Sequence, residues 1–339
     1  MVDQFPMKEI AFQAGVSLAT VDRALHGRAG VRAVTRARVA AAIGELERQY
    51  GAVGLAGRRV SIDVVMEAPR RFSDAVRAAF EAELPALRPA SVTARFHVGQ
   101  TLGDAEFLSI LKAIRRRGSH GVVLKAPLRD GIAEMARGLM AAGIPVLTFV
   151  TDLPEDARAA YVGIDNRAAG AAAAWLMGHM LVGRPCEVMT TMSSAQFSGE
   201  DERVTGFREA MAERFPKIGI LQVSEGMGLE RDTKELVAAA LEAHPGIGAV
   251  YSVGGGNRAV LQAFREARRE CRVFAAHDLD RANRALLAAR QLTFVIHHDL
   301  RQDARTVCQA VLHYHRMLSD EVRFVPSRFE VVTPEGLVD

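Results

Sequence analysis

From Val60 onward the chain alternates short apolar runs with helical stretches, and this alternation limits the possible folds more than any other feature of the sequence. Runs typical of strands cover residues 60–66, 92–98, 120–124, 145–149, 160–164, 186–190, 219–223, 248–253, 272–276, 292–296 and about 328–332. Helical stretches lie between them, at 72–87, 104–116, 132–142, 168–181, 202–214, 230–243 and 259–268. Strands that alternate with helices of this length form right-handed βαβ units, so we expect an α/β fold with parallel sheets.

The expected strands fall into two similar sets, one before and one after residue 165. Two such sets favour two doubly wound lobes. An eight-stranded barrel stays open as the alternative, because the number of strands alone excludes it poorly.

Length and composition suit a chain of two or three domains that does not span a membrane. The chain has 339 residues, of which 49% are hydrophobic, and none of its apolar runs approaches the roughly 18 residues of a membrane span. The N-terminal sequence MVDQFPMKEIAF lacks a basic and then apolar export signal, so we expect a cytoplasmic protein. The three cysteines match neither a metal-binding spacing nor a disulfide framework.

The first 50 residues predict a different, helical unit. In PMKEIAFQAGVSLATVDRALHG, Pro6 suits the start of one helix and Ser17 caps the start of a second, with Gly15 in the turn between them. Two short helices joined by such a turn form a helix-turn-helix. A third amphipathic helix is expected from about Thr35 to Tyr50.

The charge of the chain is concentrated in this unit. Residues 1–59 hold nine Lys and Arg against five Asp and Glu, whereas the other 280 residues hold 34 basic and 35 acidic side chains. A basic head on a neutral body is typical of nucleic-acid binding, although such an excess also arises by chance.

In a DNA-binding helix-turn-helix the N-terminal residues of the second helix enter the major groove. Those residues here are Ser17, Leu18, Ala19, Thr20 and Arg23. Arg23 suits a guanine, because its guanidinium can bond O6 and N7 together. The alternative is a plain three-helix cap with a solvated Arg23.

The stretch MKEIAFQAGVSLATVDRALHGRAGV, followed by TRARV, resembles the head of the lactose-repressor (LacI/GalR) family of bacterial regulators. The similarity runs without gaps from Met7 to about Leu46. It implies that operator DNA is contacted by Ser17, Leu18, Ala19, Thr20, Arg23 and His26. His26 stands where the family usually has Asn, and Asp22, where Ser is frequent, adds a negative charge near the DNA.

Between the head (1–50) and the body lies a connector at 51–59. The family places a hinge helix there that wedges a Leu into the minor groove, and Leu55 in the stretch Leu55-Ala56-Gly57-Arg58 resembles that wedge. Gly51, Gly54 and Gly57 each oppose a helix by about 1 kcal/mol relative to Ala. A hinge helix and a flexible linker are therefore both open.

The body resembles the periplasmic sugar-binding-protein fold that this family carries, through GIPVLTFVTDLP and AAYVGIDNRAAGAAAAWLMG. The resemblance implies an N-terminal lobe of residues 60–164 plus 298–325 and a C-terminal lobe of residues 165–297 plus 326–339. The chain then crosses between the lobes three times.

In open parallel sheets a ligand lies beyond the carboxyl ends of the strands, here between the two lobes. The expected effector-binding residues are Phe72, Lys125, Thr151, Asp152, Asp165, Ser193, Gly256, Asn257, Asp278 and His298. Asp278 and His298 stand at ligand positions of the family. The ligand-binding Arg of the family is replaced by Asp201, and Arg203 lies two residues later.

Other chemistries find little support in the sequence. His297 and His298 are adjacent on a strand and point to opposite faces, so they cannot easily share a metal ion. The glycines at 254–256 could hold a phosphate, but no Walker sequence follows them. We expect no enzyme, metal or cofactor, and we expect the single Trp175 to lie in a core.

The interpretation is a transcription regulator, with two chains pairing as a homodimer on a near-palindromic operator. A carbohydrate-like effector between the lobes (a sugar, polyol or sugar acid) would change its DNA affinity. A ligand-independent repressor or architectural protein with a degenerate cleft stays open as the alternative.

Overall fold

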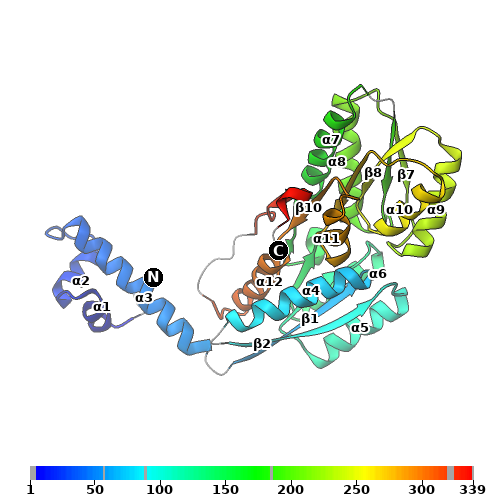
Figure 1. Ribbon diagram of the computed structural model, residues 1–339. Coiled ribbons are helices and arrows are strands. Elements are labelled where there is room, and N and C mark those ends of the chain that lie inside the picture. The colour runs from blue at the N-terminus through cyan, green and yellow to red at the C-terminus, as the bar shows by residue number, and fades with distance from the viewer. Residues whose placement is uncertain (1–4, 56–57, 88–89, 184–185, 319–323, 338–339) are drawn as a thin grey trace.

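The computed structural model describes residues 5–55, 58–87, 90–183, 186–318 and 324–337, with the backbone alone over 47–55. A helical head is followed by two α/β lobes, and Figure 1 shows the head set apart from the lobes. Within the described ranges no helix is both long and apolar enough to cross a membrane.

The head contains α1 (Met7–Ala14), α2 (Leu18–Leu25) and α3 (Ala33–Leu55). α1 ends at Gly15, whose φ of 60° is left-handed and therefore favours glycine. The Ser17 hydroxyl accepts a hydrogen bond from the Thr20 N–H at 3.2 Å, so the predicted cap of the second helix is present. The buried core of the head consists of Phe5, Ile10, Ala11, Ala14, Val21, Val39, Ala42 and Leu46.

The third helix is longer than the expected 35–50. It begins at Ala33 and continues to Leu55, so the first part of the connector has a helical backbone despite Gly51 and Gly54. Residues 56 and 57 and the side chain of Leu55 lie outside what the structure describes, and the DNA-wedge role of Leu55 stays a prediction.

The first lobe is built on a parallel sheet with the strand order β2-β1-β3-β4-β5. Its strands are β1 (Arg59–Glu67), β2 (Ser91–Gly99), β3 (Gly121–Lys125), β4 (Val146–Phe149) and β5 (Ala160–Val162). One face packs against α4 (Arg70–Glu83) and α12 (Leu300–Tyr314), and the other against α5 (Asp104–Arg117) and α6 (Asp130–Ala141). The predicted helix 72–87 ends early, as a 3-10 turn over Leu84–Leu87.

The second lobe has a six-stranded sheet in the order β11-β10-β9-β8-β6-β7. Its strands are β6 (Glu187–Thr191), β7 (Ile220–Val223), β8 (Ile247–Ser252), β9 (Val273–His277), β10 (Phe294–His298) and β11 (Phe329–Val332). Helices α7 (Asn166–Leu181) and α8 (Ser198–Arg214) cover one face; α9 (Glu230–Ala243), α10 (Asn257–Glu266) and α11 (Arg281–Ala288) cover the other. Two separate open sheets rule out the barrel alternative.

Two further expectations differ from the structure. β11 pairs antiparallel to β10. The chain between these two strands passes through the first lobe, so β11 enters the second sheet from the hinge and not after a crossover helix packed on that sheet. Trp175 is 48% exposed instead of lying in a core, because α7 buries the stripe of Ala169, Ala173 and Met177.

Three crossings join the lobes. The chain passes from β5 to α7 around Ile164, from β10 to α12, and back from residue 324 into β11. The first and third crossings lie side by side, since Ile164 forms a parallel bridge with Ser327 and the Ser327 N–H donates to the Gly163 carbonyl at 2.8 Å. The pairing leaves a narrow hinge behind the cleft.

Candidate ligand cleft and nucleic-acid interface

The N-terminal part of α2 is presented to solvent. Ser17, Leu18, Ala19 and Arg23 are exposed, whereas Val21 faces inward and is fully buried. The Arg23 Nε donates to the Ala19 carbonyl at 3.0 Å, so the guanidinium lies back along the helix toward its N-terminal end. The exposed predicted DNA-contact residues therefore share one continuous surface with the half-buried Thr20.

The negative charge at Asp22 is paired within the head. Arg28 Nη1 lies 2.8 Å from Asp22 Oδ2, and His26 Nδ1 lies 3.0 Å from Asp22 Oδ1. Because a cation is already bonded to this carboxylate, its repulsion of a nearby phosphate is reduced. His26 ends α2 and is exposed beside the contact surface.

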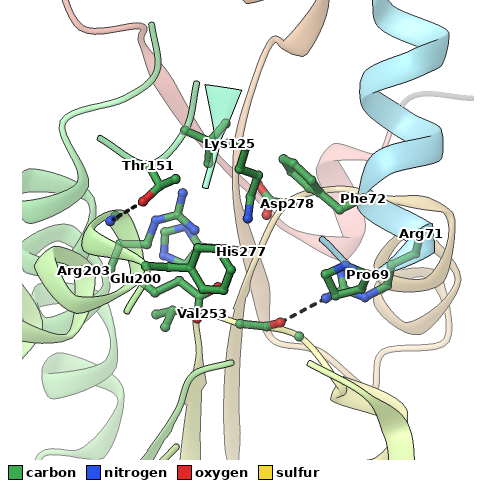
Figure 2. Close-up of a pocket in the computed structure, with 15 residues that line it drawn as sticks. Pro69, Arg71, Phe72, Lys125, Thr151, Glu200, Arg203, Val253, His277 and Asp278 are labelled. Carbon is green, nitrogen blue, oxygen red and sulfur yellow. Dashed lines mark hydrogen bonds between the residues drawn. The ribbon is translucent and has the colours of Figure 1, made fainter. Parts of the chain in front are cut away.

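Both sheets have the strand order 2-1-3-4-5 in their parallel part, with the order reversing between the first and third strands of each. Ligands of such sheets bind beyond the carboxyl ends of the strands at that reversal. In the first lobe these ends carry Pro69 and Lys125, and in the second they carry Val253 and Gly254. All four residues line one cavity between the lobes (Figure 2).

The cavity is small. Its volume is about 30 Å³, room for one or two water molecules, so a larger ligand needs the lobes to open. The lining residues are Pro69, Arg71, Phe72, Lys125, Val150, Thr151, Phe197, Gly199, Glu200, Arg203, Val253, Gly254, Gly255, His277 and Asp278.

Contacts on both rims hold the lobes together. Arg71 at the start of α4 donates from Nη1 to Asp280 Oδ2 at 2.7 Å and from Nη2 to the Gly254 carbonyl at 3.1 Å. On the other rim, the Leu128 N–H donates to the backbone carbonyl of Gln196 at 2.6 Å. Arg129 Nε donates to the side-chain oxygen of the same Gln196 at 3.0 Å. These four hydrogen bonds join residues of different lobes and stabilise the closed arrangement.

Lys125 is the buried cation of the first lobe. It ends β3, and its ammonium donates to the Glu67 carbonyl at 3.1 Å. The ammonium lies 4.2 Å from the ring centroid of Phe197 and 5.7 Å from that of Phe72, which are cation–π distances. Burial lowers the pKa of Lys125.

α8 supplies a carboxylate and a guanidinium from the second lobe. Glu200 accepts from the Ser193 N–H at 2.7 Å and from the Ser193 hydroxyl at 2.6 Å, while burial raises its pKa. Arg203 is 2% exposed; its Nε donates to Asn166 Oδ1 at 2.8 Å, and its Nη2 is buried with no hydrogen-bond partner.

Asp278 and Val150 occupy strained backbone positions at the cleft, each with a φ of 66°. Side-chain-bearing residues rarely adopt this conformation, and such outliers concentrate at functional sites. The surrounding sheet holds them in place: the Asp278 N–H donates to the Ile296 carbonyl at 2.9 Å, and the Val150 N–H to the Val162 carbonyl at 3.0 Å.

His277 precedes Asp278 and is fixed as a neutral ring. The Tyr251 hydroxyl lies 2.7 Å from its Nε2, and burial followed by the Arg203 charge holds the pKa of His277 well below its usual value. Burial also raises the pKa of Tyr251, so the phenol donates and the imidazole accepts.

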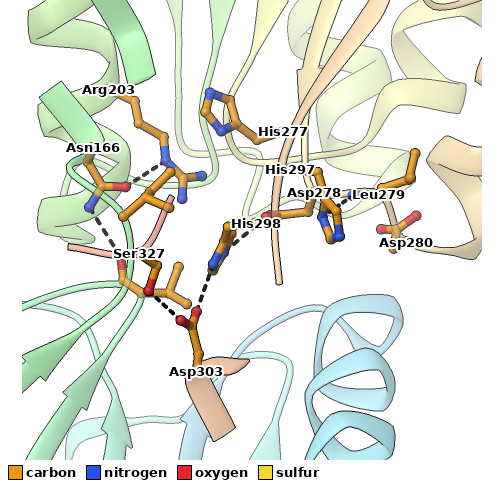
Figure 3. Close-up of polar contacts among 12 residues, drawn as sticks. Asn166, Arg203, His277, Asp278, Leu279, Asp280, His297, His298, Asp303 and Ser327 are labelled. Atoms are coloured by element: carbon orange, nitrogen blue, oxygen red, sulfur yellow. Dashed lines mark hydrogen bonds and ion pairs between the residues drawn. The ribbon is translucent and has the colours of Figure 1, made fainter. Parts of the chain in front are cut away.

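A buried chain of polar groups leads from the cleft to the hinge (Figure 3). His298 Nε2 lies 3.8 Å from Asp278 Oδ1 and has no hydrogen-bond partner, while His298 Nδ1 bonds Asp303 Oδ2 at 2.7 Å. The other Asp303 oxygen accepts from the Ser327 hydroxyl. His298, Asp303 and Ser327 lie at the second and third crossings, so a contact at His298 reaches the hinge.

The expected effector-binding residues fall into three groups. Phe72, Lys125, Thr151 and Asp278 line the cavity. Ser193 and His298 lie behind the cavity. The Ser193 hydroxyl donates to the lining residue Glu200, and His298 faces the lining residue Asp278.

The remaining four are not brought to the cavity. Asp152 pairs with Arg158, Asp165 caps α7, Gly256 precedes α10 with a φ of 71°, and Asn257 donates to Asn283.

The lining residues without a sequence prediction include Arg71, Phe197, Glu200, Arg203 and His277. His277 directly precedes the predicted Asp278 and ends the same strand, so its position at a strand end could have identified it as a lining residue. Arg203 had a partial signal too, because the helix places residue 203 rather than 201 toward the cleft. Among the described residues no cluster of three His, Cys, Asp or Glu side chains suits a metal ion.

Two family models match the chain. Residues 64–315 match the periplasmic binding protein domain, and residues 6–48 match the bacterial regulatory proteins of the lacI family. The chain is also 28% identical over 312 residues to the HTH-type transcriptional regulator MalR of Streptomyces coelicolor, covering 87% of this chain and 78% of that protein.

Solved structures share the fold of the lobes. GanP, a glucose-galactose binding protein from Geobacillus stearothermophilus, matches with a TM-score of 0.73 and 19% identity over 83% of this chain and 99% of its own. A solute binding protein from Burkholderia graminis in complex with D-arabinose matches with a TM-score of 0.74 and 19% identity, over 83% of this chain and 96% of its own.

Proposed function

The chain belongs to the periplasmic binding protein domain family and carries a head of the lacI family of bacterial regulatory proteins, and from this premise we propose that it represses transcription under the control of a small effector. The head binds operator DNA, and the cleft between the lobes binds the effector. The observation that carries the proposal is the presence, in one chain, of an exposed recognition helix and a cleft between two lobes that is lined by the buried Lys125, Glu200 and Arg203, with Arg203 Nη2 unpartnered.

Specific DNA recognition rests on the contact surface of α2. Leu18 and Ala19 offer apolar contacts for thymine methyl groups, and Arg23 offers a paired donor for guanine. The pairing of Asp22 with Arg28 supports the same role, because it reduces the charge that opposes phosphates.

Effector control rests on the cleft and its hinge. Closure of two lobes around a ligand is a hinge motion, and here the residues behind the cleft lie at the lobe crossings. A ligand that favours the closed lobes then shifts DNA affinity through one coupling free energy, and DNA shifts ligand affinity by the same factor.

The effector class is a sugar, polyol or sugar acid. Asp278 offers acceptors for hydroxyl groups, Arg203 and His298 offer buried polar nitrogens, and Phe72 and Phe197 offer apolar faces. The names of the structural relatives point the same way, since one is a glucose-galactose binding protein and one holds D-arabinose.

The protein acts as a homodimer in the cytoplasm and carries no catalytic activity in this proposal. A two-fold dimer presents two recognition helices to two half-sites, so its operator is near-palindromic. Sedimentation analysis of the full-length protein with and without operator DNA tests the dimer.

The proposed function is tested by selecting bound duplexes from a random DNA library with the full-length protein and then measuring operator affinity by fluorescence anisotropy. We expect a near-palindromic sequence to be enriched, and at least one carbohydrate to change operator affinity by roughly 5- to 150-fold. Arg116→Ala, an exposed change on α5 outside both proposed sites, should enrich the same sequence and show the same carbohydrate response as the unchanged protein. Enrichment of no sequence contradicts the proposal.

A ligand-independent repressor is the second candidate, and the small volume of the cavity is the observation that favours it. Asp278→Ala separates the two functions. Under effector control this variant loses the carbohydrate response and keeps operator binding, whereas a degenerate cleft gives no response in either protein.

A further inference from the structure

Two buried cations from different lobes line the cleft without a salt bridge to a carboxylate. Lys125 comes from the first lobe and Arg203 from the second, and they are 8% and 2% exposed. Among the described residues neither forms an ion pair within 4.0 Å. Burying a charge without a salt bridge is costly, and the carboxylates of Glu200 and Asp278 in the same cavity offset that cost only from a distance, so a ligand anion in direct contact would be stabilised.

The contacts that Lys125 and Arg203 do make are to neutral groups. The Lys125 ammonium has the Glu67 carbonyl and two aromatic faces. Arg203 Nε has the Asn166 amide oxygen, and Arg203 Nη2 has no partner although it is buried at the cavity. Hydrogen bonds to neutral oxygens orient these side chains without neutralising them, which leaves each of them suited to an anionic acceptor.

The carboxylates in the cleft are engaged differently. Glu200 is bonded through both oxygens to Ser193, and burial raises its pKa while the charge of Lys125 lowers it. Asp278 lies beside His298 Nε2, and its oxygens suit the hydroxyl groups of a ligand. The cavity is therefore lined by Lys125 and Arg203 as cations and by Asp278 as an acceptor (Figure 2).

Closure brings the two cations into one small space. Burial lowers the pKa of Lys125 most, the charges of Glu200 and Asp278 raise it, and the charge of Arg203 lowers it, so the two cations repel each other. A ligand anion placed between them converts this repulsion into two attractions, one to each lobe. It then favours the closed lobes more than a neutral ligand of the same shape does.

We propose that the effector is a compact sugar acid, whose carboxylate bridges Lys125 and Arg203 while its hydroxyl groups bind Asp278. The inference rests on the proposed function and specifies the effector class of the same cleft. A planar carboxylate suits the space better than a phosphate ester, because the cavity is small and Arg203 has one unpartnered nitrogen.

The test compares ligands that differ only at the charged group, by thermal shift and calorimetry on the full-length protein. D-Gluconate is paired with D-glucitol, D-glucuronate is paired with D-glucose, and D-glucose 6-phosphate and the corresponding galactose series complete the set. We expect an aldonate or uronate to bind roughly 10- to 100-fold more tightly than its matched aldose and polyol.

Each other outcome contradicts the inference in a different way. Equal or tighter binding of the neutral sugar overturns the sugar-acid class and leaves the proposed function in place. Tighter binding of the phosphate ester overturns the carboxylate assignment. Binding of no carbohydrate, acidic or neutral, overturns both the inference and the effector part of the proposed function.

Two variants locate the anion. Lys125→Met and Arg203→Met keep the side-chain bulk and remove the charge, so each is expected to weaken acid binding at least tenfold and polyol binding less. Arg208→Met, an exposed change on the same helix as Arg203, is the control. Circular dichroism checks folding, and the wild-type ligand series decides the question if the variants do not fold.

Discussion

The recognition helix and the cleft place functional side chains in opposite ways. The DNA-contact residues are near neighbours in sequence, mostly exposed, and belong to a single helix. The cleft residues come from segments between Pro69 and Asp278, belong to both lobes, and include buried charges. A surface of neighbouring residues can therefore change without disturbing the fold, whereas a change in the cleft alters packing, charge and lobe closure together.

The largest expected effect tests whether the head folds independently. Ile10→Ala opens a cavity in the head core, which costs about 2–5 kcal/mol. Because a unit of this size has only a few kcal/mol of stability, we expect operator binding to be lost. The effector affinity and the main calorimetric transition stay unchanged, since the head core shares no residue with the cores of the lobes.

Phe12→Ala is the matched control for that variant, because Phe12 is on the same helix and 89% exposed. A shift of the main transition in Ile10→Ala would show that head and lobes unfold as one unit, and the contrast between the two regions would then fail.

A smaller effect is expected at the DNA-contact surface. Arg23→Ala removes the proposed guanine contact and weakens operator binding by about 1–3 kcal/mol, with relaxed sequence preference at one position of each half-site. Competition between operator variants in anisotropy measures it. Loss of affinity that is uniform over all sequences would instead assign Arg23 to a phosphate.

The rim of the cleft gives the next effect. Arg71→Ala removes the hydrogen bonds to Asp280 and Gly254 and weakens closure by about 1–2 kcal/mol, roughly 5- to 30-fold in effector affinity. Small-angle scattering should show a larger radius of gyration. Arg70→Ala, one residue away and exposed, should change neither quantity.

The smallest effect is the pH dependence of Glu200→Gln. Burial raises the pKa of Glu200 in the folded chain, so the native state binds this proton more tightly than the unfolded state. Stability is therefore lost as the pH rises from the unfolded value through the folded pKa. Melting temperatures between pH 4 and 8 should fall more with rising pH in the wild type than in the variant, and parallel curves would contradict this.

The two regions also differed in how far the sequence predicted them. The cap at Ser17 and the turn at Gly15 were predicted because both depend on local backbone chemistry. The strands were predicted because buried parallel strands are continuous apolar runs. The direction of β11 was missed, because it depends on where the third crossing returns to the second sheet.

In the cleft the sequence predicted lining residues at the ends of strands but not those on the face of α8. Lys125 ends β3 and Asp278 follows β9, and both were predicted. Arg203 lies on α8, where the direction of a side chain depends on how the helix packs. Asp165 and Asn257 also lie near strand ends, but capping and the contact with Asn283 occupy them.

The sequence by itself determined the order of elements, the separate basic head and the family, because these depend on local spacing and composition. The tertiary structure alone decided which charges meet. Lys125 and Arg203 are 78 positions apart, and only the folding and closure of two lobes place both beside one cavity. The physical reason is that burial and unsatisfied charge are properties of the packed chain, set by which groups surround a side chain rather than by which residues precede it.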